Sequence, residues 1–189
     1  MGLMGVLETL QDPEARGHFL NAAAAAENAD GVFDDILEQI DPRFRSAVLL
    51  HRKDEELHTE LLRRRVQDLG VTPYDVRPEH NLFLAIGAAI GHTPPVSVGA
   101  GYTWILVGEE LAVWQYSLLA PLFEQVGDGM TTLVLDRIIE DEKRHVRLCL
   151  EIVHRYDVSI RSMARARAIA SRVFLEWSKK ILRREQWPT

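Results

Sequence analysis

Hydrophobic residues recur at intervals of three and four positions along most of this chain, and that spacing predicts amphipathic α-helices. No segment shows the alternation of apolar and polar residues that would favour β-strands. A long connection at 70–101 interrupts the pattern and is expected to hold one short apolar helix near 81–90. The rest of the pattern predicts five helices, at 13–40, 42–69, 102–123, 130–156 and 158–182.

Local signals mark where these helices begin and turn. Asp12-Pro13 and Asp41-Pro42 each place a capping aspartate before a proline at the first helical position. Gly127-Asp128-Gly129 predicts a turn between the third and fourth helices. Short turns pair the first four helices into two antiparallel hairpins, and the long connection becomes a crossover. The chain is therefore expected to form one all-α domain over 1–189, a four-helix bundle with a fifth C-terminal helix.

The pattern Asp-Glu-x-x-His occurs twice, at 54–58 and at 141–145. Glu55 and His58 in the first copy, and Glu142 and His145 in the second, are separated by the same interval, and the two copies are offset by 87 residues. A Glu and a His three positions apart lie on one face of a helix. Each copy therefore points a carboxylate and an imidazole at one place.

Each copy also has an acidic partner on the preceding helix. Residues at the same level of an antiparallel hairpin are equidistant from its turn. The midpoint of Glu27 and Glu55 is residue 41, within the Asp41-Pro42 turn. The midpoint of Glu142 with Glu109 or Glu110 falls at 125.5 or 126, just before the second turn. Glu27 and one of these two glutamates are thus expected to be level with the repeated motifs.

The choice between Glu109 and Glu110 depends on which face of the helix is buried. Glu109 shares its face with Tyr102, Ile105 and Tyr116, which form a core-like stripe, so we favour Glu109 and retain Glu110 as the alternative.

Other polar residues on these helices have more than one interpretation. His51 lies one turn before Glu55, where it could be a proton donor, an extra metal ligand or a core histidine with a hydrogen-bond partner. Glu151 and His154 form a third Glu-x-x-His about half a turn round the helix from Glu142, so they are expected to face away. A buried Glu–His cluster that binds no metal is the structural alternative for the whole set.

Composition limits the remaining functions. The 189 residues carry a net charge of -6, which argues against nonspecific nucleic-acid binding. From Arg161 onward the chain has eight basic and two acidic residues. This basic segment leaves open a contact with a protein partner or a membrane surface. The longest apolar run, 82–91, is too short to span a bilayer. The lone Cys149 excludes an intrachain disulfide or a cysteine metal knuckle, and with no signal-peptide pattern it favours a cytoplasmic location.

The two motifs with their partner glutamates resemble the ferritin-like di-iron carboxylate superfamily, over about residues 13–156. Within it, the apolar crossover at 82–91 and the last helix look most similar to demethoxyubiquinone hydroxylase-type members. The spacing of the first hairpin and of the crossover is also similar to aldehyde-deformylating-oxygenase-type members. Val107-Gly108-Glu109 departs from the Ala-Val-Glu expected there. The resemblance implies that Glu55 and Glu142 bridge the two iron ions and that Asp54 and Asp141 each hold the imidazole of the other motif. It also implies that Tyr116 corresponds to a tyrosine found at this position in several members. The implied iron ligands are Glu27, Glu55, His58, Glu109, Glu142 and His145.

By this resemblance the expected cofactor is a pair of iron ions, with Mn/Fe and Mn/Mn pairs left open. The leading prediction is an O2-dependent di-iron oxygenase or oxidase that acts on a small, partly apolar organic substrate and takes electrons from an external donor. The alternative is a ferroxidase or a peroxide-reducing iron-handling protein of the ferritin or rubrerythrin kind. A homodimer is left open as the oligomeric state.

Overall fold

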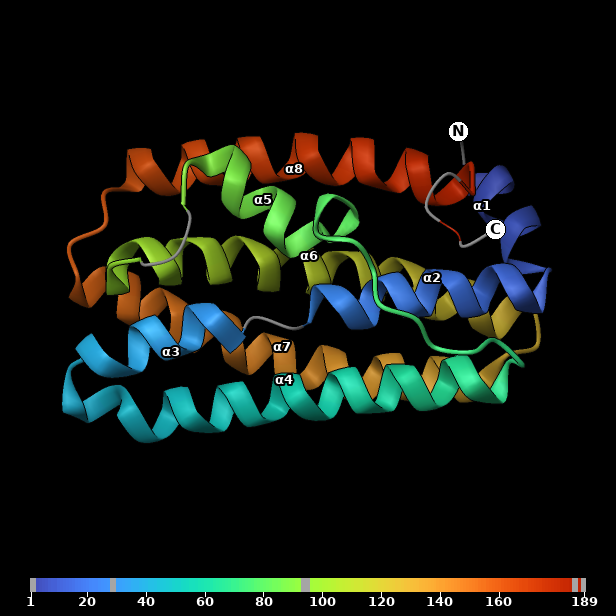
Figure 1. Ribbon diagram of the computed structural model, residues 1–189, viewed down its shortest axis with the longest axis horizontal. Coiled ribbons are helices and arrows are strands. Elements are labelled where there is room, and N and C mark those ends of the chain that lie inside the picture. Colours follow the sequence, from blue (N-terminus) through green and yellow to red (C-terminus); the bar gives the residue numbers. More distant parts are fainter. Residues whose placement is uncertain (1–2, 28–29, 93–95, 185–186, 188–189) are drawn as a thin grey trace.

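The computed structural model describes residues 3–27, 30–92, 96–184 and 187. Helices and their connections make up all of these residues, and no strand occurs among them. Figure 1 shows the helices running along one long axis. In chain order they are α1 (Leu3–Leu10), α2 (Pro13–Ala26), α3 (Asp30–Gln39), α4 (Pro42–Asp68), the 3-10 turn η1 (Pro78–His80), α5 (Leu82–Ile90), α6 (Val98–Gln125), α7 (Gly129–Arg155) and α8 (Ile160–Leu182).

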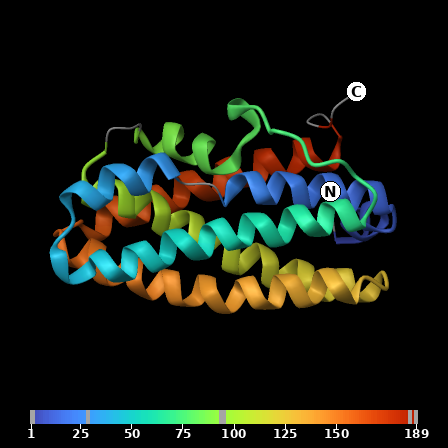
Figure 2. The same cartoon turned by 60° about the horizontal axis from the view of Figure 1, so that its bottom comes forward.

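The long helices form a bundle whose two sides differ. α4 and α7 lie side by side along one side, and α5 and α8 cover the opposite side, with α6 between them (Figures 1 and 2). α6 packs along α7, and α2 packs along α4, as the two hairpins require. The all-helical bundle expected from the hydrophobic spacing is confirmed at this level.

The aspartates before the two prolines act as the sequence predicts. The Asp12 carboxylate accepts a hydrogen bond from the Glu14 backbone N–H, at 3.0 Å, and the Asp41 carboxylate accepts one from the Arg43 backbone N–H, at 3.1 Å. These bonds satisfy backbone donors that the first turn of a helix leaves unpaired. Both helix starts, at Pro13 and Pro42, are therefore confirmed.

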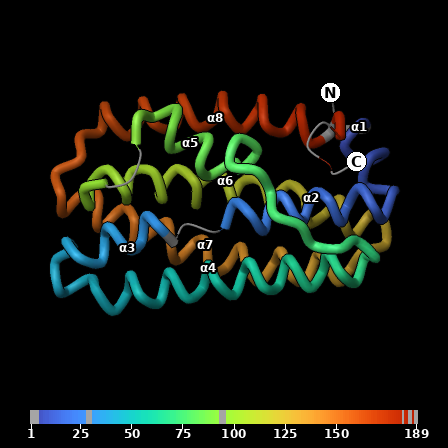
Figure 3. Tube along the Cα trace, viewed as in Figure 1, coloured from blue at the N-terminus to red at the C-terminus, as the bar shows by residue number. Residues whose placement is uncertain are grey.

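The expectation of one continuous helix over 13–40 is wrong. α2 ends at Ala26, Glu27 caps it, and a separate helix α3 begins at Asp30. Figure 3 shows α2 and α3 as two helices in succession beside α4. Asp30 and Gly31 form the start of α3, and both are weak helix formers, which favours a new helix start here over continuation of α2. Residues 28–29 of the expected helix, and 93–95 of the expected crossover, lie outside the described residues.

Two further elements differ from the sequence prediction. α1 lies before the first helix expected from the sequence, and it packs on α2 and α6. α6 starts at Val98 rather than 102, because the Ser97 side chain caps it by accepting from the Ala100 backbone N–H.

α8 buries the apolar stripe expected of it, through Ala166, Ala170, Phe174, Trp177 and Ile181. Among the described residues, no helix combines the length and the apolar character needed to cross a bilayer.

Candidate metal centre

Polar side chains from α2, α4, α6 and α7 meet inside the bundle, where apolar groups would normally be found. Each of them is at least nine-tenths buried, and Glu142 and His58 have no exposed surface at all. The set contains all six residues favoured from the sequence, together with His51: Glu27, His51, Glu55, His58, Glu109, Glu142 and His145.

These side chains form two adjoining groups, each able to hold a metal ion. The first contains Glu27, Glu55, His58 and Glu142, and their ligand atoms all lie within 4.8 Å of one another. His58 Nδ1 is 3.1 Å from Glu142 Oε1, 3.7 Å from Glu27 Oε2 and 3.8 Å from Glu55 Oε1. Ligands about 2.1 Å from a common ion have spacings of this order.

The second group contains His51, Glu55, Glu109 and His145, again with ligand atoms within 4.8 Å of one another. His145 Nδ1 is 3.0 Å from Glu55 Oε1 and 3.9 Å from Glu109 Oε2. His51 Nε2 is 2.9 Å from Glu109 Oε1, and its ring stacks on that of His145 with centroids 3.9 Å apart. His51 thus faces the cluster rather than a separate partner in the core.

Two glutamates connect the groups. Glu55 belongs to both. Glu142 directs Oε1 toward His58 Nδ1 and Oε2 toward His145 Nδ1, each at 3.1 Å. A carboxylate with one oxygen facing each group is placed to bridge two cations.

Each motif aspartate holds the histidine of the other motif. Asp141 Oδ2 lies 3.4 Å from His58 Nε2, and Asp54 Oδ2 lies 3.3 Å from His145 Nε2. Carboxylates accept hydrogen bonds, so each imidazole directs its Nε2–H to an aspartate and turns Nδ1 toward the glutamates, which makes Nδ1 the atom that would bind a metal ion. This is the arrangement that orients histidine ligands in metalloproteins.

The charges of the cluster are poorly balanced by the protein alone. Burial and the neighbouring Glu109 raise the pKa of Glu55 well above its ordinary value, and the same causes raise the pKa of Glu142. Burial opposes protonation of His58, but the adjacent carboxylates of Glu142 and Glu27 raise its pKa to about 11. Without cations, these groups hold protons to reduce the repulsion among buried carboxylates.

Several of the same atoms lack hydrogen-bond partners. Glu55 Oε1, Glu142 Oε1 and His58 Nδ1 are buried and make no hydrogen bond, although they face one another at short distances. Buried polar atoms are seldom left unpaired. Two divalent cations would satisfy these atoms and offset four carboxylate charges, so the residues fit a two-metal site.

Tyr116 supports the first group from α6. Its hydroxyl donates to Glu27 Oε1, and both side chains are buried. Burial and the Glu27 charge raise the pKa of Tyr116 well above its ordinary value, so the phenol keeps its proton and remains a donor.

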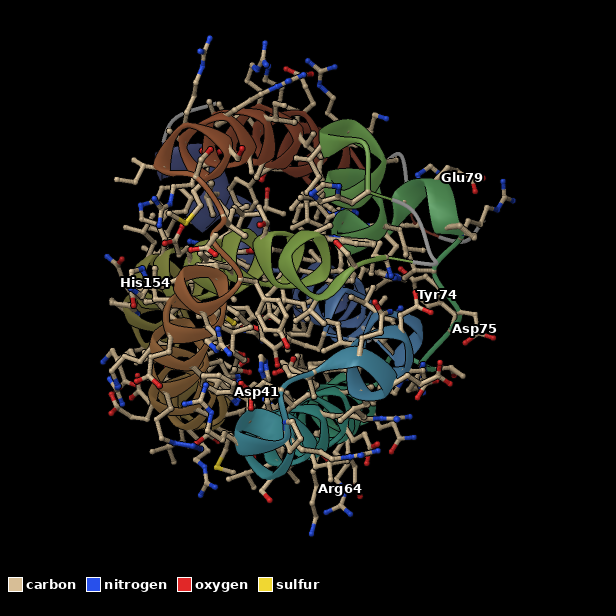
Figure 4. The ribbon with its side chains drawn as sticks, turned by 90° about the vertical axis from the view of Figure 1, so that its left-hand side faces the viewer. Asp41, Arg64, Tyr74, Asp75, Glu79 and His154 are labelled. Atoms are coloured by element: carbon tan, nitrogen blue, oxygen red, sulfur yellow. The ribbon has the colours of Figure 1, made fainter. Side chains whose placement is uncertain are left out.

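The remaining acidic candidates point elsewhere. Glu110 accepts from the Arg167 guanidinium on α8 and takes no part in either group. Glu151 and His154 are exposed, and Figure 4 shows His154 on the outside of the bundle.

A cavity of about 50 Å³ opens on the side of the cluster away from α4 and α7. Three of the glutamates, Glu27, Glu55 and Glu109, form part of its wall, and the rest is mainly apolar. Gln115 also lines it. Gln115 was missed from the sequence because it stands beside Trp114 and Tyr116 with no motif spacing to distinguish it.

Comparison with known proteins adds no further constraint: no protein-family model, curated protein or solved structure matches this chain.

Proposed function

We propose that this chain is an O2-dependent di-iron oxygenase or oxidase of the ferritin-like carboxylate type, acting on a small, partly apolar organic molecule. The observation that carries the proposal is the pairing of two aspartate-held imidazoles with four buried glutamates. His58 and His145 present Nδ1 to these carboxylates, and Glu142 directs one oxygen to each.

The residues divide the binding of two iron ions between them. Glu27 and His58 would hold one ion, Glu109 and His145 the other with His51, and Glu55 and Glu142 would be shared. A reduced iron pair supplies two electrons to dioxygen. Hard carboxylate oxygens favour the oxidised metals, and the imidazoles keep the site from being wholly anionic.

The protein residues also control what reaches this site. The cavity beside the glutamates is walled by Phe83, Ile86, Ile105 and other apolar groups, which admit dioxygen and exclude most water. Tyr116 keeps Glu27 in one orientation through its hydroxyl. Electrons must come from a separate donor.

Iron handling is the second candidate, and the size of the cavity favours it. About 50 Å³ is well below the ~150 Å³ of a cavity that binds benzene. A ferroxidase needs room only for iron and dioxygen, whereas an oxygenase must also admit part of an organic molecule.

Anaerobic loading with iron(II) followed by oxygen separates the two candidates. The oxygenase is expected to retain two iron ions per chain, to consume dioxygen once, and then to stop until a reductant is supplied. Light scattering should show no mineral growth. Continued oxidation of excess iron(II), with scattering that rises, would overturn the oxygenase proposal in favour of the ferroxidase.

The adjacent residues Glu109 and Glu110 provide a matched test of the ligand set. Glu109→Gln is expected to reduce retained iron from two ions per chain to about one, because it removes a buried carboxylate of the second group. Glu110→Gln should leave both ions, since Glu110 instead pairs with Arg167. Metal analysis after desalting measures both variants, and equal loss from the two would refute the assignment of Glu109.

A further inference from the structure

A second, larger cavity lies next to the cavity at the metal centre. Its volume is about 260 Å³, and it is enclosed by α1, α2, α6 and α8 through residues such as Leu10, Phe19, Leu119 and Phe174. Apart from Thr9, Gln115 and Ser178, its walls are apolar. Trp114, Leu118 and Leu175 form part of it and are about half exposed, so the cavity reaches the surface.

Gln115 is the residue that both cavities share. Neighbouring turns of the same helices line the inner cavity, at the metal centre, and the larger outer cavity. On α2, Ala23 lines the inner cavity and Phe19 the outer one. On α8, Trp177 lines the inner cavity and Phe174 the outer one. The inner and outer cavities therefore continue one another along the space between α2, α6 and α8, with Gln115 at the junction.

The Gln115 side chain has no partner of its own. It is 7% exposed, yet no hydrogen bond joins it to any residue in the described part of the chain. Its amide atoms are not among the fully enclosed polar atoms that lack a partner, so they are accessible from the cavity space. Such a group at the junction of two cavities is placed to bind a polar group of a ligand.

We infer that the outer cavity binds the apolar portion of the substrate, and that Gln115 hydrogen-bonds an uncharged oxygen group near the reacting end. This inference rests on the proposed oxygenase function and names its substrate class: an aliphatic or alicyclic alcohol, aldehyde or ketone. A rotation of the Gln115 side chain joins the cavities, and the reacting carbon enters the small space beside Glu27, Glu55 and Glu109.

The charge of the walls selects against acids. Among the described residues that line either cavity there is no lysine or arginine, and the charged ones are the three glutamates of the metal centre. A carboxylate carried into this space would be desolvated without a cationic side chain to pair with. An alcohol with the same apolar chain carries no charge, and its hydroxyl group can hydrogen-bond to the Gln115 amide.

Binding of 1-octanol and octanoate to the full-length protein, measured anaerobically by calorimetry, tests this inference without any turnover. 1-Octanol is expected to bind at one site. The affinity for octanoate should be at least roughly tenfold weaker, because the charge of its carboxylate stays unpaired. Gln115→Leu should weaken the binding of 1-octanol by about three- to tenfold, the contribution of one hydrogen bond, and leave the affinity for octanoate unchanged.

Two serines on α8 supply a matched pair of blocking variants. Ser178 lines the outer cavity, and Ser178→Trp should weaken 1-octanol by roughly tenfold or more by occupying its space. Ser162 lies near the start of α8 and lines a separate pocket that shares no residue with the outer cavity, so Ser162→Trp should have no effect.

No saturable binding of 1-octanol, an equal effect of the two tryptophans, or octanoate binding as tightly as the alcohol would each overturn the inference. Concentration-dependent self-association that Ser178→Trp abolishes, without alcohol binding, would show instead that the apolar face meets another protein. Saturable binding of 1-octanol by protein that continues to oxidise excess iron(II) would uphold the cavity assignment and reject the oxygenase. A single oxidation cycle without alcohol binding would uphold the oxygenase and reject the cavity assignment.

Discussion

Glu142→Ala is expected to abolish loading of both metal positions, the largest effect of any single substitution at the centre. Glu142 has no exposed surface, and each of its oxygens lies 3.1 Å from the Nδ1 of a different histidine. Loss of this carboxylate removes a ligand from each position at once. Metal analysis should fall from two ions per chain to well below one, and the rise in melting temperature on adding iron(II) or zinc should disappear.

The same substitution should leave the metal-free fold intact. Burial and Glu109 raise the pKa of Glu142, which means that its ionised form is disfavoured in the metal-free protein. A carboxyl whose pKa is raised by folding lowers stability at neutral pH, so removing Glu142 relieves that cost, although a cavity is left. We therefore expect little change in the metal-free melting temperature.

Glu151→Ala is the control for this experiment, because Glu151 belongs to a Glu-x-x-His on the same helix but is exposed. It should load metal normally. Normal two-metal loading by Glu142→Ala would contradict the assignment of the centre, and unfolding of the metal-free variant would contradict the account of its charges.

Gly87→Ala is expected to give the largest loss of stability away from the centre. Gly87 is buried in α5, and a methyl group there would lie 2.2 Å from the ring of Trp104, far inside contact distance. Trp104 cannot move away easily: it is 1% exposed, stacks on Phe83, and donates from Nε1 to the Phe83 carbonyl at 2.8 Å.

Overpacking of this kind costs about 1–3 kcal/mol, more than the ~1 kcal/mol that alanine gains over glycine within a helix. Urea unfolding of the metal-free protein, followed by circular dichroism, measures the difference. Gly31→Ala is the matched helical control, since nothing lies within 4 Å of its added methyl group, and it should be neutral or slightly stabilising. Equal stability of Gly87→Ala and the parent protein would mean that α5 can shift away from α6.

Local signals in the sequence account for much of the fold. The Asp12-Pro13 and Asp41-Pro42 starts depend on capping bonds within one turn, which is why they could be predicted. The interruption after Glu27 was missed because apolar residues continue on both sides of it, through Ala26 and Val32. Hydrophobic spacing reports which face is buried and gives little information about whether the backbone is continuous.

The site was predictable to the extent that it depends on helix geometry. Equidistance from the turns placed Glu27 beside Glu55, because two antiparallel helices fix that relation. The environment of Glu110 was not predictable, since it depends on Arg167 of α8 and on how that helix lies against α6. Gln115 could not be singled out for the same reason: a cavity is defined by space that several helices together leave unfilled.

The offset of 87 residues relates the two motifs but not the whole cluster, since the position 87 residues after Glu27 is Trp114. Asp54, Glu55 and His58 all have counterparts on α7, but the position 87 residues after His51 is Ile138, a fully buried apolar residue. The two groups of the centre therefore differ chemically: the group with Glu27 contains one imidazole, and the group with Glu109 contains two. Since manganese favours oxygen ligands and iron accepts imidazole more readily, a mixed pair would be sorted, with manganese beside Glu27 and iron beside His51.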